Sequence, residues 1–565
     1  MRLAIAFALS VLAAGWAGAT PPKPPIHTPD RAMVAAANPE AVEAGLKVLR
    51  AGGSAMDAAV AVQIALGLVE PQSSGLGGGA FMVYYDAKTR HVTAYDGREM
   101  APGGATKDMF LKADGTPLTY AEAVLSGRSA GTPGAIAMLA LAHKEHGAKP
   151  WASLFEDTER LATDGFLVGP RMAGLVASGA PQAHAPDVVA YFTKADGTLV
   201  KAGDHLKNPA YAATLRRVAA EGPAALLQGK IAGDIVARLA QAPLPGTMTL
   251  ADLAAYRPRE SEALCRLYRT WTVCEPALPS GGLATLEGLG LLERTDIAKR
   301  GPADPQAWFE LAQVERLMYA DDRRYAADPA FVSVPVQGLL DPAYLDERAK
   351  LIGDQAGPAP EPGHPAGALA MGPDATLEPG GTSSFVVVDP QGNVVVMTTT
   401  VESLFGDGRM VDGFLLNNQL TDFSFSPKDS DGTPAANAVG PRKRPRSSMS
   451  PTLILDREGR FVAAIGSPGV LAIPSYVLKG VVGVMDWKLS MQQAVALPNL
   501  VAIGDLYFSE PGKLGPVVVE GLAKRGIVVH GGGGAEASGL HGIIVRDGGL
   551  EGGADPRREG VARGF

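Results

Sequence analysis

The chain has 565 residues and a mass of 58.4 kDa, with a net charge of −8 at pH 7, 46% hydrophobic and 19% charged residues. This acidic balance, without a basic tail, gives no electrostatic basis for binding nucleic acid. The apolar content is too high for a disordered chain. We therefore expect two or more structural units, or one large layered domain.

The first 19 residues have the pattern of a secretory signal peptide. Arg2 precedes an apolar run from Leu3 to Leu12, and the small residues Ala17-Gly18-Ala19 end the segment. This run is too short to span a bilayer, and we expect cleavage before Thr20 and a secreted or periplasmic protein. The alternative is a buried N-terminal helix. Since no other stretch of about 18 apolar residues occurs, we expect no membrane association after signal removal.

Helices dominate the predicted elements of the first half. Residues 39–51 have amphipathic spacing after the capping residue Asn38, and residues 54–70 are almost entirely apolar, which predicts a buried helix. A glycine-rich loop and a strand over 80–86 follow, and residues 120–330 read as mainly helical.

The two cysteines, Cys265 and Cys274, lie in "CRLYRTWTVC", which has the alternation of a hairpin. In an exported protein this arrangement favours a cross-strand disulfide, with two buried thiols as the alternative. No further Cys or paired His stands at ligand spacing, so we expect no metal site.

The sequence pattern changes from mainly helical to mainly strand-like near residue 382. Residues 353–381 are rich in Pro, Gly and Ala without apolar periodicity, and this predicts an exposed, flexible segment. Strand patterns follow, beginning with "SSFVVVD" and "NVVVMTTTV" around a "PQGN" turn. One helix, over 475–487, interrupts the later strands.

Three short motifs match catalytic or nucleotide-binding patterns but lack their context. Gly127–Gly131 fits G-x-S-x-G, yet a helical pattern precedes Ser129 where the nucleophile elbow needs a strand. "HGGGG" at 530–534 resembles an oxyanion loop but follows that serine. "GLGGGA" at 75–80 has helix and strand in the wrong order for a dinucleotide site. We reject all three, retaining the 75–80 glycines as a tight loop that could face a substrate.

Thr382 is the candidate nucleophile. A threonine hydroxyl needs a base, and cleavage just before Thr382 would free its own α-amine for that role. The small residues Gly380 and Gly381 and the flexible segment before them suit such a cleavage. On local pattern alone, a loop threonine without a role is the stronger interpretation.

Six further segments change that balance, because they resemble the γ-glutamyltransferase family in order along the chain. They are "GGSAMDAAVA" (52–61), "GLGGGAFM" (75–82), "REMAP" (98–102), "LLNNQLTDFS" (415–424), "NAVGPRKRPRSSMSPT" (437–452) and "GSPG" (466–469). The segment from Thr382 is similar to the one that opens the small subunit of that family. The resemblance extends to "GGADPRREGVARG" at 552–564.

The resemblance implies an α+β, four-layer αββα N-terminal-nucleophile (Ntn) hydrolase fold. It implies self-cleavage between Gly381 and Thr382 into a large chain (20–381) and a small chain (382–565) that form one intertwined heterodimer. Thr382 would attack the γ-amide of glutathione or a related γ-glutamyl compound, and water or an acceptor amine would take the acyl group. No cofactor is implied.

The resemblance also implies roles for individual residues. Arg98 would bind the α-carboxylate through its planar fork, Asp422 would bind the α-ammonium, and Thr400 would orient Thr382. Further contacts to the substrate would come from Glu402, Gln419, Ser447 and Ser448, and the backbone at Gly469 and Val470 would form the oxyanion hole. Alone, each could be structural: Arg98 in an ion pair, the serines in a turn, Asp422 as a cap.

The chain departs from the family pattern at several positions. Val470 stands where a second glycine is usual, and a β-branched residue resists a positive φ. Glu402 replaces a common Asn, Ser384 a frequent His, and the lid segment 425–436 is short and lacks Tyr. A more open site predicts bulkier amides as substrates. The alternatives are an amidase of the same fold acting on glutaryl-type amides, as cephalosporin acylases do, or an inactive binding protein.

Overall fold

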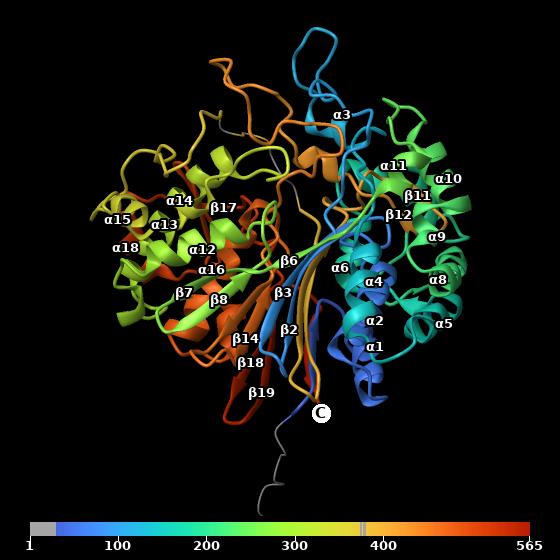
Figure 1. The fold of residues 1–565 in the computed structure, drawn as a ribbon, viewed down its shortest axis with the longest axis horizontal. Helices are drawn as coiled ribbons and strands as arrows, with labels where there is room; N and C mark the ends of the chain where they lie inside the picture. The colour runs from blue at the N-terminus through green and yellow to red at the C-terminus, as the bar shows by residue number, and fades with distance from the viewer. Residues whose placement is uncertain (1–29, 373, 375, 377–379) are drawn as a thin grey trace, which may run out of the picture.

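The computed structural model describes residues 30–372, 374, 376 and 380–565, so the predicted signal peptide lies outside the described residues. Two β-sheets pack face to face at the centre, and helices cover both outer faces (Figure 1). This is the four-layer αββα arrangement, and the predicted Ntn hydrolase fold is confirmed.

The first sheet interleaves strands from distant parts of the chain, each antiparallel to its neighbours. Its order is β20 (Val561–Gly564), β1 (Met33–Ala36), β9 (Ser383–Val388), β10 (Val394–Thr400), β2 (Gly79–Asp86), β3 (His91–Asp96) and β6 (Arg259–Glu262). The strands β9 and β10 are central in this sheet and wholly buried, as their near-continuous apolar sequences require.

The second sheet has the order β19 (Gly549–Ala554), β18 (His541–Arg546), β14 (Phe461–Gly466), β13 (Thr452–Leu455), β8 (Trp271–Glu275) and β7 (Leu264–Tyr268). Between the sheets lies an aliphatic core that includes Val386, Val396, Leu453 and Ile543. The predicted hairpin of the two cysteines is β7–β8, where Cys265 pairs with Cys274 and the two form a disulfide.

Two groups of helices complete the outer layers. The first sheet is covered by α1 (Pro39–Arg50), α2 (Ala55–Val69), α4 (Ala135–His146), α5 (Glu156–Asp164), α8 (Pro209–Glu221) and α10 (Gly229–Leu239). The second is covered by α12 (Gly282–Leu292), α13 (Pro305–Tyr325), α16 (Ile473–Val481), α17 (Met491–Ala496) and α18 (Pro516–Ala523).

Shorter elements connect these layers. The helices are α3 (Tyr120–Val124), α6 (Pro170–Val176), α7 (Pro186–Phe192), α9 (Ala224–Leu227), α11 (Leu250–Ala255), α14 (Val336–Leu339) and α15 (Pro342–Ala349). The strands are β4 (Phe166–Leu167), β5 (His205–Leu206), β11 (Met410–Val411), β12 (Phe414–Leu415), β15 (Leu500–Ile503), β16 (Leu506–Ser509) and β17 (His530–Gly531). Short 3₁₀ turns at Gln419–Asp422 and Val470–Ala472 border the site described below.

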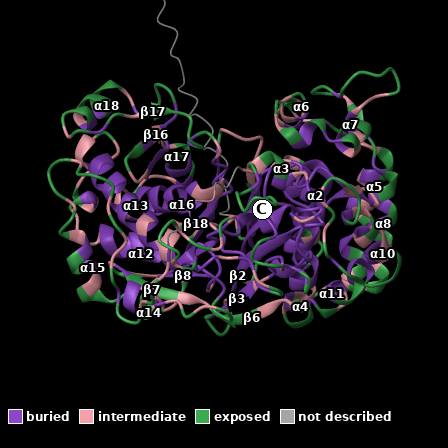
Figure 2. Cartoon of the chain, turned by 90° about the horizontal axis from the view of Figure 1, so that it is seen from above, coloured by how far each residue is buried: buried purple, intermediate pink, exposed green. Residues whose placement is uncertain are grey.

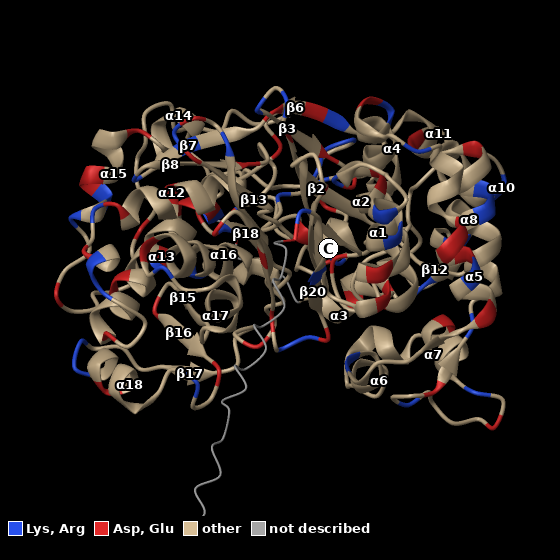
Figure 3. Ribbon diagram, turned by 90° about the horizontal axis from the view of Figure 1, so that it is seen from below, with Lys and Arg blue, Asp and Glu red and all other residues tan. Residues whose placement is uncertain are grey.

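The helices predicted from sequence form for the expected reasons. The Asn38 side chain caps α1 by accepting from the Glu40 amide, and every residue of α2 is buried. Burial is concentrated in the strands and the inner helices such as α2 and α13 (Figure 2). Charged side chains of both signs are interspersed on outer helices such as α8 and α15 (Figure 3).

Neither a membrane span nor a metal cluster is found in the part of the chain that the structure describes. No helix there is both long and apolar enough to cross a bilayer. No three or more His, Cys, Asp or Glu side chains there gather in a way that could hold a metal ion.

Candidate active site

The hairpin of β9 and β10 brings Thr382 and Thr400 together. Ser383 pairs with Thr399, so the next residues outward, Thr382 and Thr400, face each other at the hairpin's open end. The Thr382 hydroxyl donates to Thr400 Oγ1 over 3.1 Å, and both residues are buried. A five-residue connection (389–393) between β9 and β10 therefore places two hydroxyls, 18 residues apart, within hydrogen-bond distance.

Hydrogen bonds hold the backbone of Gly381, just before Thr382, on both sides. The Thr400 hydroxyl donates to the Gly381 carbonyl over 2.8 Å, and the Gly381 amide donates to the Glu402 carbonyl over 2.8 Å. A Cβ at Gly381 would lie 2.8 Å from the carbonyl carbon of Ser403, so glycine is required by the close approach of two backbones.

Thr400 is itself fixed on both sides. The Glu402 amide donates to its hydroxyl oxygen over 2.7 Å, which leaves the hydroxyl proton for the Gly381 carbonyl. The backbone of the 75–80 loop packs behind it, where a Cβ on Gly78 would lie 2.0 Å from the Thr400 carbonyl oxygen. The loop that we expected could face a substrate thus packs against the backbone of Thr400.

Arg98 and Asp422 form a buried ion pair, with Nη2 of Arg98 2.6 Å from Oδ2 of Asp422. Arg98 also donates to the carbonyls of Pro445 and Arg446, while its Nη1 has no hydrogen-bond partner among the described residues. Gln419 donates to the same Asp422 oxygen over 2.6 Å, and its own Oε1 is unpartnered. In the part of the chain that the structure describes, Arg98 Nη1 and Gln419 Oε1 are therefore both unsatisfied, as expected at a site for a polar ligand.

Burial controls the ionisation of the acids beside Arg98. It raises the pKa of Asp422 above its ordinary value, although the Arg98 charge opposes the shift. It raises the pKa of Glu99 to about 8, again against the attraction of Arg98, whose Nη1 lies 3.8 Å from Glu99 Oε2. Asp422 thus has two hydrogen-bond partners, Arg98 and Gln419, that stabilise its charged form. Glu99 is held largely protonated at pH 7.

The loop at Gly469 and Val470 begins a 3₁₀ turn that leads into α16. Val470 has a φ of 63°, the left-handed conformation that a glycine would adopt, so valine is accommodated here at the cost of local strain. Its side chain lies beside the segment before the nucleophile, because a Cβ on Gly380 would approach Val470 Cγ2 to 2.6 Å.

One small cavity, with a volume of about 20 Å³, is bordered by nearly all of the predicted site residues. Its lining comprises Arg98, Thr382, Thr400, Glu402, Gln419, Asp422, Ser447, Ser448, Met449, Val470 and Ile473. Such a volume holds about one water molecule. Gly469 directly precedes Val470 but does not line the cavity. The structure thus brings together residues from six separated stretches of sequence.

Some residues at the site were not predicted. Met449 lies inside the quoted "RSSMSPT" motif and could have been read from it, whereas Ile473 carried no signal. Tyr120, at the first position of α3, donates to Glu402 Oε2 over 3.2 Å, and Asn418 bonds to both groups. Tyr120 lies 262 residues before the nucleophile in the sequence, yet its hydroxyl contacts the site. No local sequence pattern indicates this contact.

The rejected motifs have structural roles. Ser129 donates to carbonyls of Val124 and Ser126 after the short helix α3, without a preceding strand. In the 530–534 loop, Gly534 accepts from Tyr476, whose ring packs under Gly469. Behind the nucleophile, Arg558 donates to the Thr382 carbonyl over 2.8 Å and to those of Ala537 and Ser538.

This geometry suits acyl transfer. A hydroxyl nucleophile, a second hydroxyl on the carbonyl to be attacked and a buried pair of opposite charges share one cavity. The Arg98–Asp422 pair could exchange partners with a zwitterionic ligand, since Arg98 Nη1 makes no hydrogen bond among the described residues and could donate to a carboxylate.

Comparison with known proteins adds the following. The family model described as Gamma-glutamyltranspeptidase matches residues 41–565. The chain is 36% identical over 479 residues to the glutathione hydrolase proenzyme of Bacillus subtilis strain 168, covering 83% of this chain and 80% of that protein. It is 36% identical over 507 residues to the Escherichia coli K12 glutathione hydrolase proenzyme, covering 86% and 85%. Cephalosporin acylase from Bacillus halodurans has the same fold, with a TM-score of 0.83, 26% identity and coverage of 98% and 99%.

Proposed function

Because this chain belongs to the γ-glutamyltranspeptidase family, we propose that it is a self-processing γ-glutamyltransferase and glutathione hydrolase. The observation that carries the proposal is the buried Arg98–Asp422 pair sharing one cavity with Thr382 and Thr400. Glutathione and other γ-glutamyl amides end in an α-carboxylate and an α-ammonium, the two charges that this pair can receive.

Maturation comes first. Thr382 Oγ attacks the Gly381 carbonyl carbon, the C–N bond breaks, and the Gly381 acyl group moves from nitrogen to oxygen as an ester. The proton lost by the hydroxyl goes to the departing nitrogen, which becomes the α-amine of Thr382. Water then hydrolyses the ester. The hydrogen bond from Thr400 to the Gly381 carbonyl supports this step, because it stabilises the negative charge that develops on that oxygen.

Turnover then uses the free terminus. The Thr382 α-amine accepts the hydroxyl proton while Oγ attacks the γ-carbonyl of the donor. The leaving amine takes that proton, and a γ-glutamyl ester remains on Thr382. Water or an acceptor amine attacks the ester and restores the hydroxyl. Backbone amides at Gly469 and Val470 would hold the oxyanion, and the position of Val470 in the cavity lining supports this role.

Recognition of the donor would use the charged and polar groups that border the cavity. The α-carboxylate would accept from Arg98 Nη1 and from Ser447 and Ser448, and the α-ammonium would donate to Asp422, Gln419 Oε1 and Glu402. Two of these atoms, Arg98 Nη1 and Gln419 Oε1, have no hydrogen-bond partner among the described residues, and each would gain one from the ligand.

A second candidate is amidase activity on glutaryl-type amides, and the likeness to a cephalosporin acylase is the observation in its favour. A glutaryl group has no ammonium, so it would give Asp422 no partner beyond Arg98 and Gln419, which it already has. The γ-glutamyl assignment is preferred for that reason. The inactive alternative rested on Val470, whose backbone adopts the glycine-like conformation.

One gel with one assay tests the proposal. Purified protein should give two bands under denaturing conditions, with the smaller chain beginning "TSSFVV", and should release p-nitroaniline from γ-glutamyl-p-nitroanilide. Thr382→Ala should give a single band of the 58 kDa class and no release. Thr382→Ser, which keeps a hydroxyl, should still cleave, more slowly. Two bands from Thr382→Ala would contradict self-cleavage by Thr382.

Two further parts of the proposal concern location and assembly. The pattern of residues 1–19 supports export to the periplasm or medium. The large and small chains of one precursor would remain together as a heterodimer, which the interleaved strands of the first sheet support.

A further inference from the structure

The turn at Val470–Ala472 keeps a backbone conformation that its sequence does not favour. Val470 has a φ of 63°, a region that β-branched residues resist. Strain of this kind persists only where the surrounding structure fixes the backbone. One hydrogen bond closes the turn from within, from the Ile473 amide to the Val470 carbonyl. Further restraint must come from the side chains that pack on the turn.

Tyr319 holds the turn from a different helix. Its hydroxyl donates to the Leu471 carbonyl over 2.8 Å and bonds over 2.9 Å to Oγ of Ser475, in the first turn of α16. The phenol has one proton and a carbonyl can only accept, so Ser475 is the donor in the second bond. Tyr319 is buried, which strengthens both bonds relative to the same contacts in water. One side chain thus ties the residue after Val470 to the helix that follows the turn.

A second tyrosine packs on the residue before Val470. The ring of Tyr476 lies against Gly469, where a Cβ would approach Cε2 of the ring to 2.3 Å. Tyr476 belongs to α16 and would move together with the turn, whereas Tyr319 belongs to α13. Of these two contacts, the one from Tyr319 therefore fixes the turn relative to another layer of the molecule.

The helix α13 is a suitable anchor because it is itself held in place. Most of its residues are buried. One turn before Tyr319, Glu315 accepts from the Ala502 amide over 2.8 Å, and Arg316 donates to the Gly504 carbonyl over 2.5 Å. These bonds tie α13 to the hairpin of β15 and β16. Since α13 lies in the proposed large chain and the turn in the small chain, the contact of Tyr319 would cross the subunit boundary.

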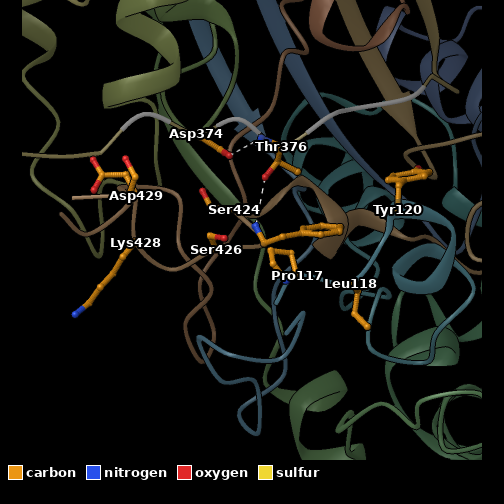
Figure 4. Close-up of a pocket in the computed structure, with 11 residues that line it drawn as sticks. Pro117, Leu118, Tyr120, Asp374, Thr376, Ser424, Ser426, Lys428 and Asp429 are labelled. Carbon is orange, nitrogen blue, oxygen red and sulfur yellow. Dashed lines mark hydrogen bonds between the residues drawn. The ribbon is translucent and has the colours of Figure 1, made fainter. Parts of the chain in front are cut away.

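Tyr319 does not border the spaces where a substrate would bind. Neither Tyr319 nor Leu471 lines the small cavity at Thr382. The same two residues are also absent from the walls of the wider pocket of about 510 Å³ that Tyr120 and Lys428 line (Figure 4). Removal of the Tyr319 hydroxyl should therefore change the turn and leave the contacts to the substrate as they are.

We propose that Tyr319 is a positioning residue for the oxyanion turn, the segment Gly469–Leu471. Its hydroxyl holds the Leu471 carbonyl and so keeps Val470 in the conformation in which the backbone amides at Gly469 and Val470 would receive the oxyanion. Tyr319 acts through the turn, without touching the reacting atoms. The inference rests on the proposed function, because it takes these two amides as the oxyanion donors.

Tyr319→Phe tests the inference, since it removes the hydroxyl and keeps the ring. Acylation and deacylation both pass through an oxyanion, so kcat for γ-glutamyl-p-nitroanilide should fall whichever step limits turnover. We expect a fall of about tenfold, a part of the roughly 100-fold that loss of an oxyanion donor costs. KM should stay within about twofold of wild type, because no substrate contact is removed. Rates are expressed per mole of small chain, so that incomplete self-cleavage does not alter them.

Tyr325→Phe is the matched control on the same helix. Tyr325 is also buried, and its hydroxyl donates to the Gly363 carbonyl over 2.6 Å, away from the oxyanion turn. Both variants lose one bond from a buried phenol to a backbone carbonyl, so their thermal midpoints should fall by similar amounts. In Tyr325→Phe, however, kcat should stay within about twofold of wild type, because the turn keeps its anchor.

The Val470→Gly background separates positioning from a general loss of structure. Glycine adopts a positive φ without strain, so the turn then needs the Tyr319 hydroxyl less. In that background Tyr319→Phe should lower kcat by less than about threefold. An equal loss in both backgrounds would overturn the inference, and so would an unchanged kcat in Tyr319→Phe alone. Either result leaves the proposed function intact, whereas a wild-type protein without turnover would defeat the proposed function itself.

Discussion

Val470 occupies a backbone conformation that favours glycine. A β-branched residue at a φ of 63° costs about 1–3 kcal/mol, and such strain persists only where the surroundings fix the backbone. The residue begins the turn into α16 and also borders the cavity at Thr382. The strain is therefore located at the atoms that would stabilise the oxyanion, and its effect on activity can be measured.

Val470→Gly should relieve this strain without moving the amide. We expect kcat/KM to remain within about threefold of wild type, because loss of an oxyanion donor would cost about 100-fold or more. The thermal midpoint should be at least as high as in wild type. Val470→Ala, which keeps a Cβ, is the matched control. A tenfold loss in Val470→Gly alone would mean that the valine side chain itself is needed.

Asp422 should determine which acyl group is preferred. In Asp422→Asn, kcat/KM for γ-glutamyl-p-nitroanilide should fall by about 100-fold, the order expected when a buried charge loses its partner. The change for glutaryl-p-nitroanilide should be far smaller, because this donor lacks the ammonium. Equal losses with the two donors would show that Asp422 acts only by holding Arg98.

At this scale the sequence predicted the identities of the site residues but not their contacts. Thr382, Arg98 and Asp422 could be named because motifs carry them. The pairing of Arg98 with Asp422, and the hydrogen bond from Tyr120 to Glu402, depend on segments more than 250 residues apart. Neither hydrophobic periodicity nor turn residues can predict contacts between segments so far apart in the sequence.

Among the elements, the hairpin β9–β10 was the most predictable, because a "PQGN" turn and two apolar runs fix its pairing. The helix predicted over 475–487 is instead α16 followed by a π-helical turn over Val482–Asp486. Strand β6, with its charged sequence "RESE", lies at an edge of the first sheet and was not predicted, since edge strands need no apolar face.

Glu275 on β8 should make stability depend on pH. Burial raises its pKa to about 8, while one oxygen accepts from Thr452 over 2.5 Å and the other has no partner among the residues that the structure describes. The folded chain therefore holds a proton that the unfolded chain releases near pH 4.5. The contribution of Glu275 to the free energy of unfolding is therefore full below pH 4.5. It falls by about 1.4 kcal/mol per pH unit as the pH rises from there toward 8.

Glu275→Gln removes this titration and keeps the shape. We expect its thermal midpoint, relative to wild type, to be higher at pH 8 than at pH 5. Glu458→Gln, at an exposed position, is the control and should show no such trend. A difference between wild type and Glu275→Gln that is the same at both pH values would contradict the raised pKa.

At the scale of the whole molecule, cleavage would divide both sheets between two chains. In the first sheet β9 and β10 of the small chain lie between β1 and β2 of the large chain, and in the second β13 pairs with β8. The disulfide joins two residues of the large chain and so does not link the subunits. The layered fold was predictable from the family resemblance, whereas this strand order was not, because pairing of distant strands leaves no local pattern.

Two chains that share both sheets should not separate under native conditions. Size-exclusion chromatography of mature protein should give one peak that contains both bands, with or without a reducing agent. Two peaks under native conditions, or subunits that separate only after reduction, would contradict the shared sheets.

The interleaving of strands also determines the molecularity of folding. An uncleaved chain brings β9 and β10 between β1 and β2 in an intramolecular step, whose rate does not depend on concentration. After cleavage, the same sheet can form again only when two separate polypeptides meet, so recovery from denaturant becomes second order. Maturation would then convert a reversible fold into one that, at the dilution of an exported protein, is assembled once and not again.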